Sequence, residues 1–187
     1  MKWEYVLISF TIIVIWYYKD KEKLEPIFKI EYSDLPDDLE LAISELSRKS
    51  KYFKNVPNFP KTLPPVPTTK GNYGSIGERY SIEFLESLYN KIFIKIRPNW
   101  LKNPKTGRNL ELDGYCEELK LAIEYNGPHH YPSTAGITEN EQKQIDRDLI
   151  KKKLCDIKGI KLLVIPYTIP IKRVPLAIYC QILEKDG

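Results

Sequence analysis

Cysteine is scarce in this sequence: Cys116, Cys155 and Cys180 stand at wide spacing and form no CxxC pair. A zinc site built on thiolates is therefore not expected, because such sites draw on closely spaced cysteines. An odd number of widely spaced cysteines is most simply explained by free thiols in a reducing compartment. No internal repeat is apparent either, so a repeat architecture is not expected.

A strong excess of either charge is also missing. Lysine and arginine number 29 against 25 acidic residues, which gives a net charge of +4. This mild balance permits a polyanionic partner, but a solvated, slightly basic surface explains it equally well. The 187 residues, of which 42% are hydrophobic, suffice for one ordinary domain with its own core and an appendage.

One long hydrophobic run is present, at the N-terminus. Residues 5–18 carry no charge, and aromatic residues stand at both ends of residues 3–18, as they do at membrane interfaces. As a helix, residues 3–18 would measure roughly 24 Å, which a bilayer core of roughly 30 Å accommodates by thinning and by lysine snorkelling. We expect residues 1–23 to be a membrane anchor, and a buried strand or core helix is the alternative.

The lysines around this run predict its orientation. Three lysines follow the run and one precedes it. Because positive charge concentrates on the cytoplasmic side of membrane anchors, the main domain is expected to face the cytoplasm. Without an anchor, the protein would be cytoplasmic.

Residues 24–74 are expected to connect the hydrophobic run to the main domain. A helix is predicted at 37–54, where apolar residues recur at helical spacing after a capping aspartate, Asp37 or Asp38. A proline-rich run follows, and prolines exclude helix and central strand. We interpret the run as a stiff spacer or as a strap across the domain surface. Its prolines are Pro57, Pro60, Pro64, Pro65 and Pro67.

Residues 75–187 are predicted to form an α/β domain with the element order α-β-β-β-α-β-α. Capping-box spacing predicts that the first helix starts at Ser75 and that the longest helix starts at Thr138. The longest helix is expected to end near Gly159, which suits a C-cap. A last helix contains Pro175 near its start. We expect a mixed sheet flanked by helices, in which the longest helix is a crossover between two strands.

Four strands are predicted in this domain, at 92–97, 110–115, 120–126 and 160–167. In the first, three isoleucines alternate with Lys95 and Arg97, which predicts a half-buried strand with the isoleucines inside. The last is almost continuously apolar, which is typical of a strand buried on both faces.

Carboxylates stand on the second and third predicted strands. Glu111 and Asp113 share a face by alternation, and Glu124 and Asn126 share a face on the next strand. If the two strands pair as a hairpin, Asp113 and Glu124 converge. Hard oxygen ligands of this kind suit Mg²⁺ or Mn²⁺. Solvated surface is the ordinary alternative for any single acid, but Glu124 lies within an otherwise apolar strand, where an unpaired carboxylate is costly.

Several short motifs follow one another along residues 74–170. They are Gly77-Glu78, Arg97-Pro98-Asn99-Trp100-Leu101, Leu110–Tyr115, Ala122–Gly127, His130-Tyr131, Asp148-Leu149-Ile150-Lys151 and Ile165-Pro166-Tyr167. This ordered set resembles the PD-(D/E)XK nuclease superfamily, and more closely its very-short-patch-repair-like branch. The resemblance implies a restriction endonuclease-like sandwich that acts on DNA, and it does not extend to residues 1–70.

The resemblance also implies roles for single residues. Asp113 and Glu124 would bind Mg²⁺ or Mn²⁺, with Glu78 assisting, and the metal would activate a water for attack on a phosphodiester. The lysine usual in the superfamily two residues after the glutamate is Asn126 here. Lys151, on the same helical face as Asp148, is the candidate substitute.

Other residues of the same motifs would contact the substrate. The family pattern favours His130 over His129 as a general acid or base or a phosphate contact, and a loop histidine bonded to backbone is the alternative. Arg97 and Trp100 are candidates for the approach to the site, although core packing is the commoner role of a tryptophan. Lys151 and Lys152 belong to a lysine run that would follow a nucleic-acid backbone, or form a solvated helix face.

Two alternatives to a nuclease follow from the same sequence. Asn126 motivates a catalytically inactive member of the fold that binds nucleic acid. The N-terminal run and the prolines motivate a membrane-anchored interaction protein. The acids Glu111, Glu117 and Glu118 are interpreted as edge or loop residues.

Overall fold

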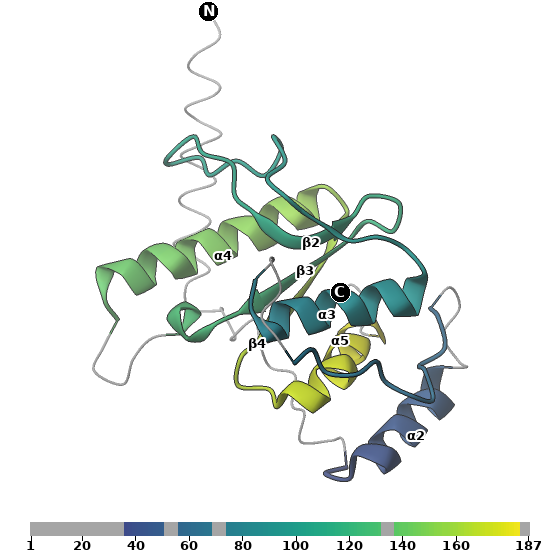
Figure 1. Ribbon diagram of the computed structural model, residues 1–187. Helices are drawn as coiled ribbons and strands as arrows, with labels where there is room; N and C mark the ends of the chain where they lie inside the picture. Colours follow the sequence, from purple (N-terminus) through teal and green to yellow (C-terminus); the bar gives the residue numbers. More distant parts are fainter. Residues whose placement is uncertain (1–35, 51–55, 69–73, 132–136, 184–187) are drawn as a thin grey trace, which may run out of the picture. The chain divides into compact units, whose positions relative to one another are not determined.

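The computed structural model describes residues 36–50, 56–68, 74–131 and 137–183 (Figure 1). The chain divides into a unit from Met1 to Glu31 and a unit from Tyr32 to Gly187, and the described residues belong to the second. The anchor predicted at residues 3–18 lies outside them and stays a prediction. Within the described ranges, no helix is long and apolar enough to cross a membrane.

A four-stranded mixed sheet forms the centre of this unit. Its order is β1-β2-β3-β4, with β1 and β3 antiparallel to β2, and β4 parallel to β3. The strands are β1 Ile94–Ile96, β2 Leu112–Cys116, β3 Leu121–Asn126 and β4 Lys161–Pro166. The parallel pair is joined through α4 (Glu139–Ile157), as a parallel connection requires. The predicted α/β fold with a mixed sheet and a crossover helix is confirmed.

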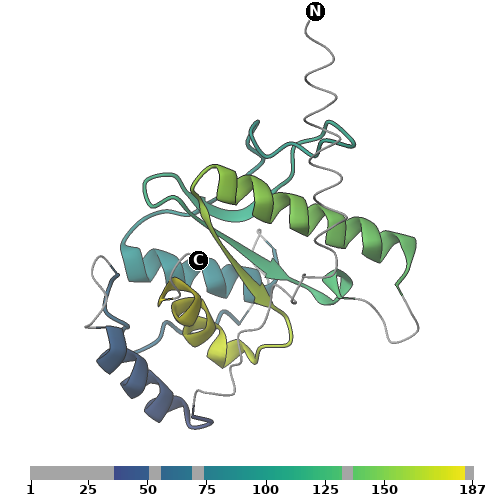
Figure 2. The same cartoon turned by 180° about the vertical axis from the view of Figure 1, so that it is seen from behind.

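Helices cover both faces of the sheet (Figures 1 and 2). On one face, α3 (Ile76–Tyr89) and α5 (Val174–Leu183) enclose a core that includes Phe84, Ile123 and Ile178. On the other face, α4 covers a smaller core that includes Leu112 and Cys155. Two short 3₁₀ helices, η3 (Pro128–His130) and η4 (Ile171–Arg173), complete the main-domain elements.

The helix boundaries follow the predicted capping residues. Ser75 is the N-cap of α3, and its hydroxyl accepts a hydrogen bond from the backbone N–H of Glu78. Thr138 and Glu141 form a complete capping box at the start of α4. Beyond the end of α4, Gly159 has φ +64°, a conformation that costs glycine little.

The proline-rich segment is a strap rather than a free spacer. Phe59 is 3% exposed and lies in the core on the α3–α5 face, with its ring 4.9 Å from that of Tyr179. The Tyr179 hydroxyl donates to the carbonyl of Pro57, and the Tyr80 hydroxyl donates to that of Pro64. The same core also takes up α2 (Leu39–Ser50), so residues before position 75 help to build it.

Strand β1 is buried differently from the prediction. Ile92 and Ile94 are 76% and 54% exposed, whereas Phe93 is buried under α3. Ile96, on the same side as Ile92 and Ile94, is partly buried against the smaller core. Alternation alone therefore did not show that Phe93 is buried while Ile92 and Ile94 are exposed. The consequence is that Lys95 and Arg97 share the face of Phe93 and line a cavity.

Candidate metal and phosphodiester site

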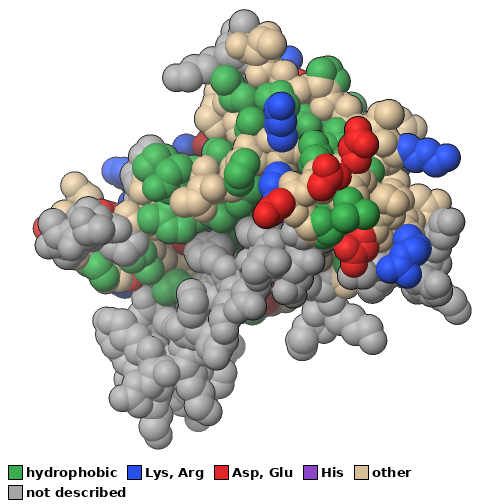
Figure 3. Space-filling model, turned by 90° about the horizontal axis from the view of Figure 1, so that it is seen from below, with side chains coloured by type: hydrophobic (Ala, Val, Ile, Leu, Met, Phe, Trp, Pro, Cys, Tyr) green, Lys and Arg blue, Asp and Glu red, His purple; other side chains and the backbone are tan. Residues whose placement is uncertain are grey.

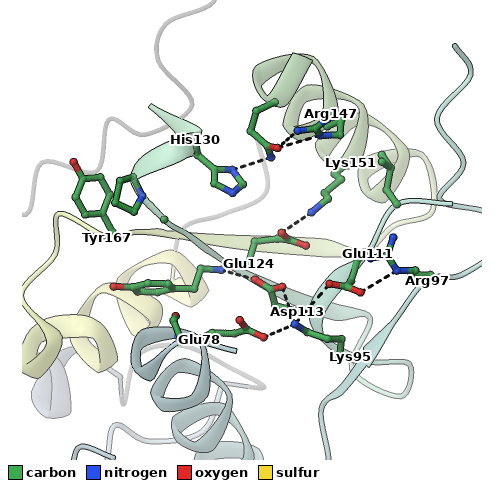
Figure 4. A pocket seen from close by; sticks show the side chains of 16 residues that line it. Glu78, Lys95, Arg97, Glu111, Asp113, Glu124, His130, Arg147, Lys151 and Tyr167 are labelled. Atoms are coloured by element: carbon green, nitrogen blue, oxygen red, sulfur yellow. Dashed lines mark hydrogen bonds and ion pairs between the residues drawn. The ribbon is translucent and has the colours of Figure 1, made fainter. Parts of the chain in front are cut away.

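A cavity of about 620 Å³ opens where β1, β2 and β3 meet the start of α3 and the inner face of α4 (Figure 4). Its charged lining balances four carboxylates against four cations. The carboxylates are Glu78, Glu111, Asp113 and Glu124, and the cations are Lys95, Arg97, Arg147 and Lys151. Among the nonpolar and neutral residues, Tyr125, His130 and Tyr167 also line it.

The hairpin brings Asp113 and Glu124 together as predicted. Gly114 pairs with Ile123, so one step further along the antiparallel ladder Asp113 stands opposite Glu124. One oxygen of Asp113, Oδ2, accepts a hydrogen bond of 3.1 Å from the backbone N–H of Tyr125. This bond fixes the Asp113 carboxylate near the start of β2, facing the cavity.

Glu124 is a buried carboxylate that lacks a full set of partners. Its residue is 4% exposed, and Oε2 accepts a 2.6 Å hydrogen bond from Nζ of Lys151. The other oxygen, Oε1, is buried and makes no hydrogen bond. Burial raises the pKa of Glu124 to about 8, the Lys151 charge lowers it, and the Asp113 charge raises it further. This arrangement favours a bound cation.

Lys95 was not predicted as a site residue, yet it contacts three carboxylates. Its Nζ lies 2.6 Å from Glu78 Oε1, 3.6 Å from Glu111 Oε1 and 3.7 Å from Asp113 Oδ1. Arg97 adds an ion pair of 2.9 Å with Glu111. Glu111, interpreted from the sequence as an edge or loop acid, lies immediately before β2 and is part of the cavity wall. The sequence signal was the alternation of Phe93, Lys95 and Arg97 on one side of a strand.

Two glycines make room for this part of the wall. A Cβ on Gly77 would stand 2.0 Å from the ring of Tyr125, and a Cβ on Gly74 would stand 2.0 Å from Oε2 of Glu78. Gly74 also has φ +73°, which disfavours other residues. The start of α3 thus lies close against Tyr125, and the Glu78 carboxylate lies close against the backbone of Gly74.

His130 lines the cavity and contacts α4 at the opposite wall. Its Nδ1 lies 2.8 Å from Oδ2 of Asp148 and 3.0 Å from Nε2 of Gln144. Gln144 also donates to Asp148, and its carbonyl oxygen accepts hydrogen bonds from Arg147. Because a carboxylate only accepts, contact with Asp148 favours the tautomer with hydrogen on Nδ1.

The remaining predicted residues lie away from the cavity lining. Asn126 is 3% exposed at the end of β3, where its backbone oxygen accepts from Tyr167. Trp100 is partly buried and packs against the smaller core, with its ring 6.2 Å from that of Tyr115. Lys152 is exposed on α4. Of the two α4 lysines predicted to contact DNA, only Lys151 lines the cavity.

The cavity can supply a hard cation with a small number of carboxylate ligands. Over the described residues, no group of three or more histidine, cysteine or acidic side chains is arranged as a metal site. Mg²⁺, however, is commonly held by one or two carboxylates, with waters and substrate phosphate completing its shell. Asp113 and Glu124 fit that pattern, and the unpartnered, buried Oε1 of Glu124 is an available ligand atom.

Comparison with known proteins identifies relatives in viruses. No family model and no solved structure matches the chain. Uncharacterized protein 033L of Invertebrate iridescent virus 3 is 34% identical over 126 residues, which cover 64% of this chain and 65% of that protein. Uncharacterized protein 307L of Invertebrate iridescent virus 6 is 34% identical over 123 residues, covering 56% and 61%. The chain thus spans less than two thirds of these two relatives.

A third relative is covered more completely. Uncharacterized protein 094L of Frog virus 3 is 37% identical over 132 residues, which cover 68% of this chain and 81% of that protein. This chain therefore belongs to the same protein family as protein 094L of Frog virus 3.

Proposed function

We propose that this protein is a metal-dependent nuclease of restriction endonuclease-like fold that hydrolyses phosphodiester bonds of DNA. The observation that carries the proposal is the pair Asp113 and Glu124, held opposite each other on neighbouring strands, with Oε1 of Glu124 buried and lacking a hydrogen bond. A mixed sheet with the crossover helix α4 beside this pair is consistent with that fold.

Asp113 and Glu124 would hold Mg²⁺ or Mn²⁺. A metal bound there supplies a water of lowered pKa and neutralises negative charge that develops on the phosphate. The hydrogen bond from the backbone of Tyr125 orients the Asp113 carboxylate, which leaves its other oxygen, Oδ1, toward Lys95. Lys151 contacts Glu124 and offsets part of the cost of its burial.

Cations inside the cavity supply the phosphate contacts in this proposal. Arg97 lies on the β1 side of the cavity and Arg147 on the α4 side, so a phosphodiester between them meets positive charge from two walls. On the face seen in Figure 3, acidic side chains gather together and the Lys and Arg side chains stand apart from one another. That face shows no continuous basic surface among its described residues.

His130 is the candidate for moving a proton. With Nδ1 as donor to Asp148, its other nitrogen, Nε2, is the one that accepts a proton. A histidine placed in the cavity wall can take a proton from a water there or return one to the leaving oxygen. Asp148 holds the ring from α4, and Gln144 donates a hydrogen bond to the other oxygen of Asp148.

Cleavage of supercoiled plasmid tests the proposal. The full-length protein with Mg²⁺ or Mn²⁺ is expected to nick or linearise the plasmid, and EDTA is expected to stop it. Asp113→Asn and Glu124→Gln should each lower the rate at least about a hundredfold, because each removes a charged ligand oxygen. Glu118→Gln is the matched control, because Glu118 forms an exposed pair with Lys91 outside the cavity. Equal rates in all four proteins would contradict the proposal.

One observation favours a second function. The four cations of the cavity wall already balance its four carboxylates, so the charge of the lining is neutralised without a metal. An inactive member of the fold would use this cavity to bind a nucleic-acid backbone. Binding of DNA that persists in EDTA, with no cleavage in Mg²⁺ or Mn²⁺, would support this second function over the first.

A further inference from the structure

We infer that Glu78 is a positioning residue for Lys95 rather than a metal ligand, and that Lys95 makes the phosphate contact for which position 126 has no lysine. This inference rests on the proposed function and assigns roles to two residues of the same cavity. It replaces the assisting role at the metal that the family resemblance implied for Glu78.

Glu78 already forms a close ion pair with Lys95 inside the cavity. Oε1 lies 2.6 Å from Nζ of Lys95, which is the shortest of the three carboxylate distances to that ammonium. Oε2 faces the backbone of Gly74, at a point where even a methyl group on Gly74 would stand 2.0 Å away. The side chain of Glu78 is 11% exposed. A largely buried carboxylate at this distance from Nζ is placed to hold the Lys95 ammonium.

The two lysines of the cavity differ in what they can reach. Lys151 is 11% exposed and donates to Glu124, whose side chain is 5% exposed, so its ammonium is committed to a buried acid. Lys95 is 33% exposed and stands 3.7 Å from Asp113 Oδ1. A phosphate placed beside Asp113 therefore lies within reach of Lys95, while Lys151 remains on the far side of the carboxylates (Figure 4).

The neighbours of Lys95 hold its ammonium in place. Nζ lies 2.6 Å from Glu78, 3.6 Å from Glu111 and 3.7 Å from Asp113. Arg97 engages the second oxygen of Glu111, so Glu111 is shared between the two cations. Removing Glu78 takes away the closest of these contacts and frees the lysine side chain to rotate away.

Two binding measurements on the full-length protein test the inference without relying on cleavage. The first is the affinity for Mn²⁺, followed by the electron paramagnetic resonance signal of free Mn²⁺. The second is the affinity for a short fluorescent DNA oligonucleotide with Ca²⁺ present. The variants are Glu78→Gln, Lys95→Met, Lys95→Arg and Asp113→Asn, with Lys91→Met as the matched control, because Lys91 forms an exposed ion pair outside the cavity.

Glu78→Gln and Lys95→Met are expected to bind DNA about tenfold more weakly. Lys95→Met is expected to bind Mn²⁺ about threefold to tenfold more tightly, because a like charge near Asp113 is gone. Glu78→Gln should keep its Mn²⁺ affinity within about threefold, whereas Asp113→Asn should lose at least about tenfold. Lys95→Arg should restore most of the DNA affinity. A merely structural defect would not tighten Mn²⁺ binding.

The opposite pattern overturns the inference. If Glu78→Gln weakens Mn²⁺ binding as much as Asp113→Asn does, Glu78 is a ligand. If Lys95→Met leaves DNA affinity unchanged, Lys95 makes no phosphate contact. If the unaltered protein binds no Mn²⁺, the inference fails with the metal site itself. A protein that shows the expected binding pattern and cuts no plasmid refutes the nuclease proposal and leaves the roles of Glu78 and Lys95 standing.

Discussion

Binding of a divalent metal at Asp113 and Glu124 is expected to release a proton. Burial raises the pKa of Glu124 to about 8, so at pH 7 the metal-free carboxyl is about 0.9 protonated. A metal binds the ionised carboxylate, and the proton must leave. We therefore predict the release of about 0.9 proton for each Mn²⁺ bound at pH 7, falling to about 0.1 at pH 9.

Isothermal titration calorimetry measures this release directly. The binding enthalpy of Mn²⁺ is recorded in buffers that differ in ionisation enthalpy, and the slope gives the number of protons transferred. The apparent affinity for Mn²⁺ should rise about tenfold per pH unit below pH 8 and level off above it. Even a Glu124 pKa of 7 would leave about half a proton to be released at pH 7.

Two variants show where the proton comes from. Glu124→Gln should bind Mn²⁺ weakly and release no proton, because the amide does not titrate. Lys151→Met should keep the release, because the Lys151 charge lowers the pKa of Glu124 and its removal raises that pKa further. A slope below about 0.2 proton at pH 7, or the same slope in Glu124→Gln, would refute this account of Glu124.

Three further predictions concern stability and location. In the metal-free protein, the free energy of unfolding should fall as the pH rises from about 4.5 to about 8, by up to about 1.4 kcal/mol per pH unit. The reason is that the pKa of Glu124 in the folded state lies above its ordinary value. Denaturant titrations measure this free energy, and a rise over the same pH range would contradict the prediction. Phe59→Ala should lower the free energy of unfolding by about 3–5 kcal/mol. Pro65→Ala, at an exposed position of the same strap, should lower it by under about 0.5 kcal/mol. Equal losses would mean that the buried Phe59 side chain does not hold the strap on the domain. Full-length protein should fractionate with membranes and need detergent for release, owing to residues 3–18, and protein that stays soluble without detergent would rule out the anchor.

The order of elements was predictable because local chemistry specifies it. Ser75 and Thr138 cap their helices by bonds within one turn, and Gly159 follows the end of α4 where the chain needs a positive φ. The convergence of Asp113 and Glu124 was also predictable, because antiparallel pairing of two adjacent strands leaves few registers. These features depend on neighbours in sequence or on a short hairpin.

The face of β1 was not predictable from its own residues. Alternation divides the strand into Ile92, Ile94 and Ile96 on one side and Phe93, Lys95 and Arg97 on the other. Which side is covered depends on where α3 and α4 end over an edge strand, and that is a property of the whole fold. The register of β1 against β2 also shifts between Ile94 and Ile96, which a hydrophobic pattern does not reveal. Lys95 was missed for this reason.

The strap and the histidine network depend on distant contacts as well. Composition excluded helix and central strand for the prolines, but burial of Phe59 against Tyr179 joins residues far apart in sequence. The contact between His130 and Asp148 likewise crosses from η3 to α4. Lys151 could be proposed from its spacing to Asp148, but its contact with Glu124 depends on how α4 packs over β3.

The most direct test of the central claim is the position of Mn²⁺ in crystals of the protein grown or soaked with it. The account predicts an anomalous scattering peak in contact with oxygens of Asp113 and Glu124, including Oε1 of Glu124, with Glu78 still bonded to Lys95. A peak bound elsewhere, or no peak in this cavity at millimolar Mn²⁺ while both lysines keep their carboxylate contacts, would contradict the claim that this pair is a metal site.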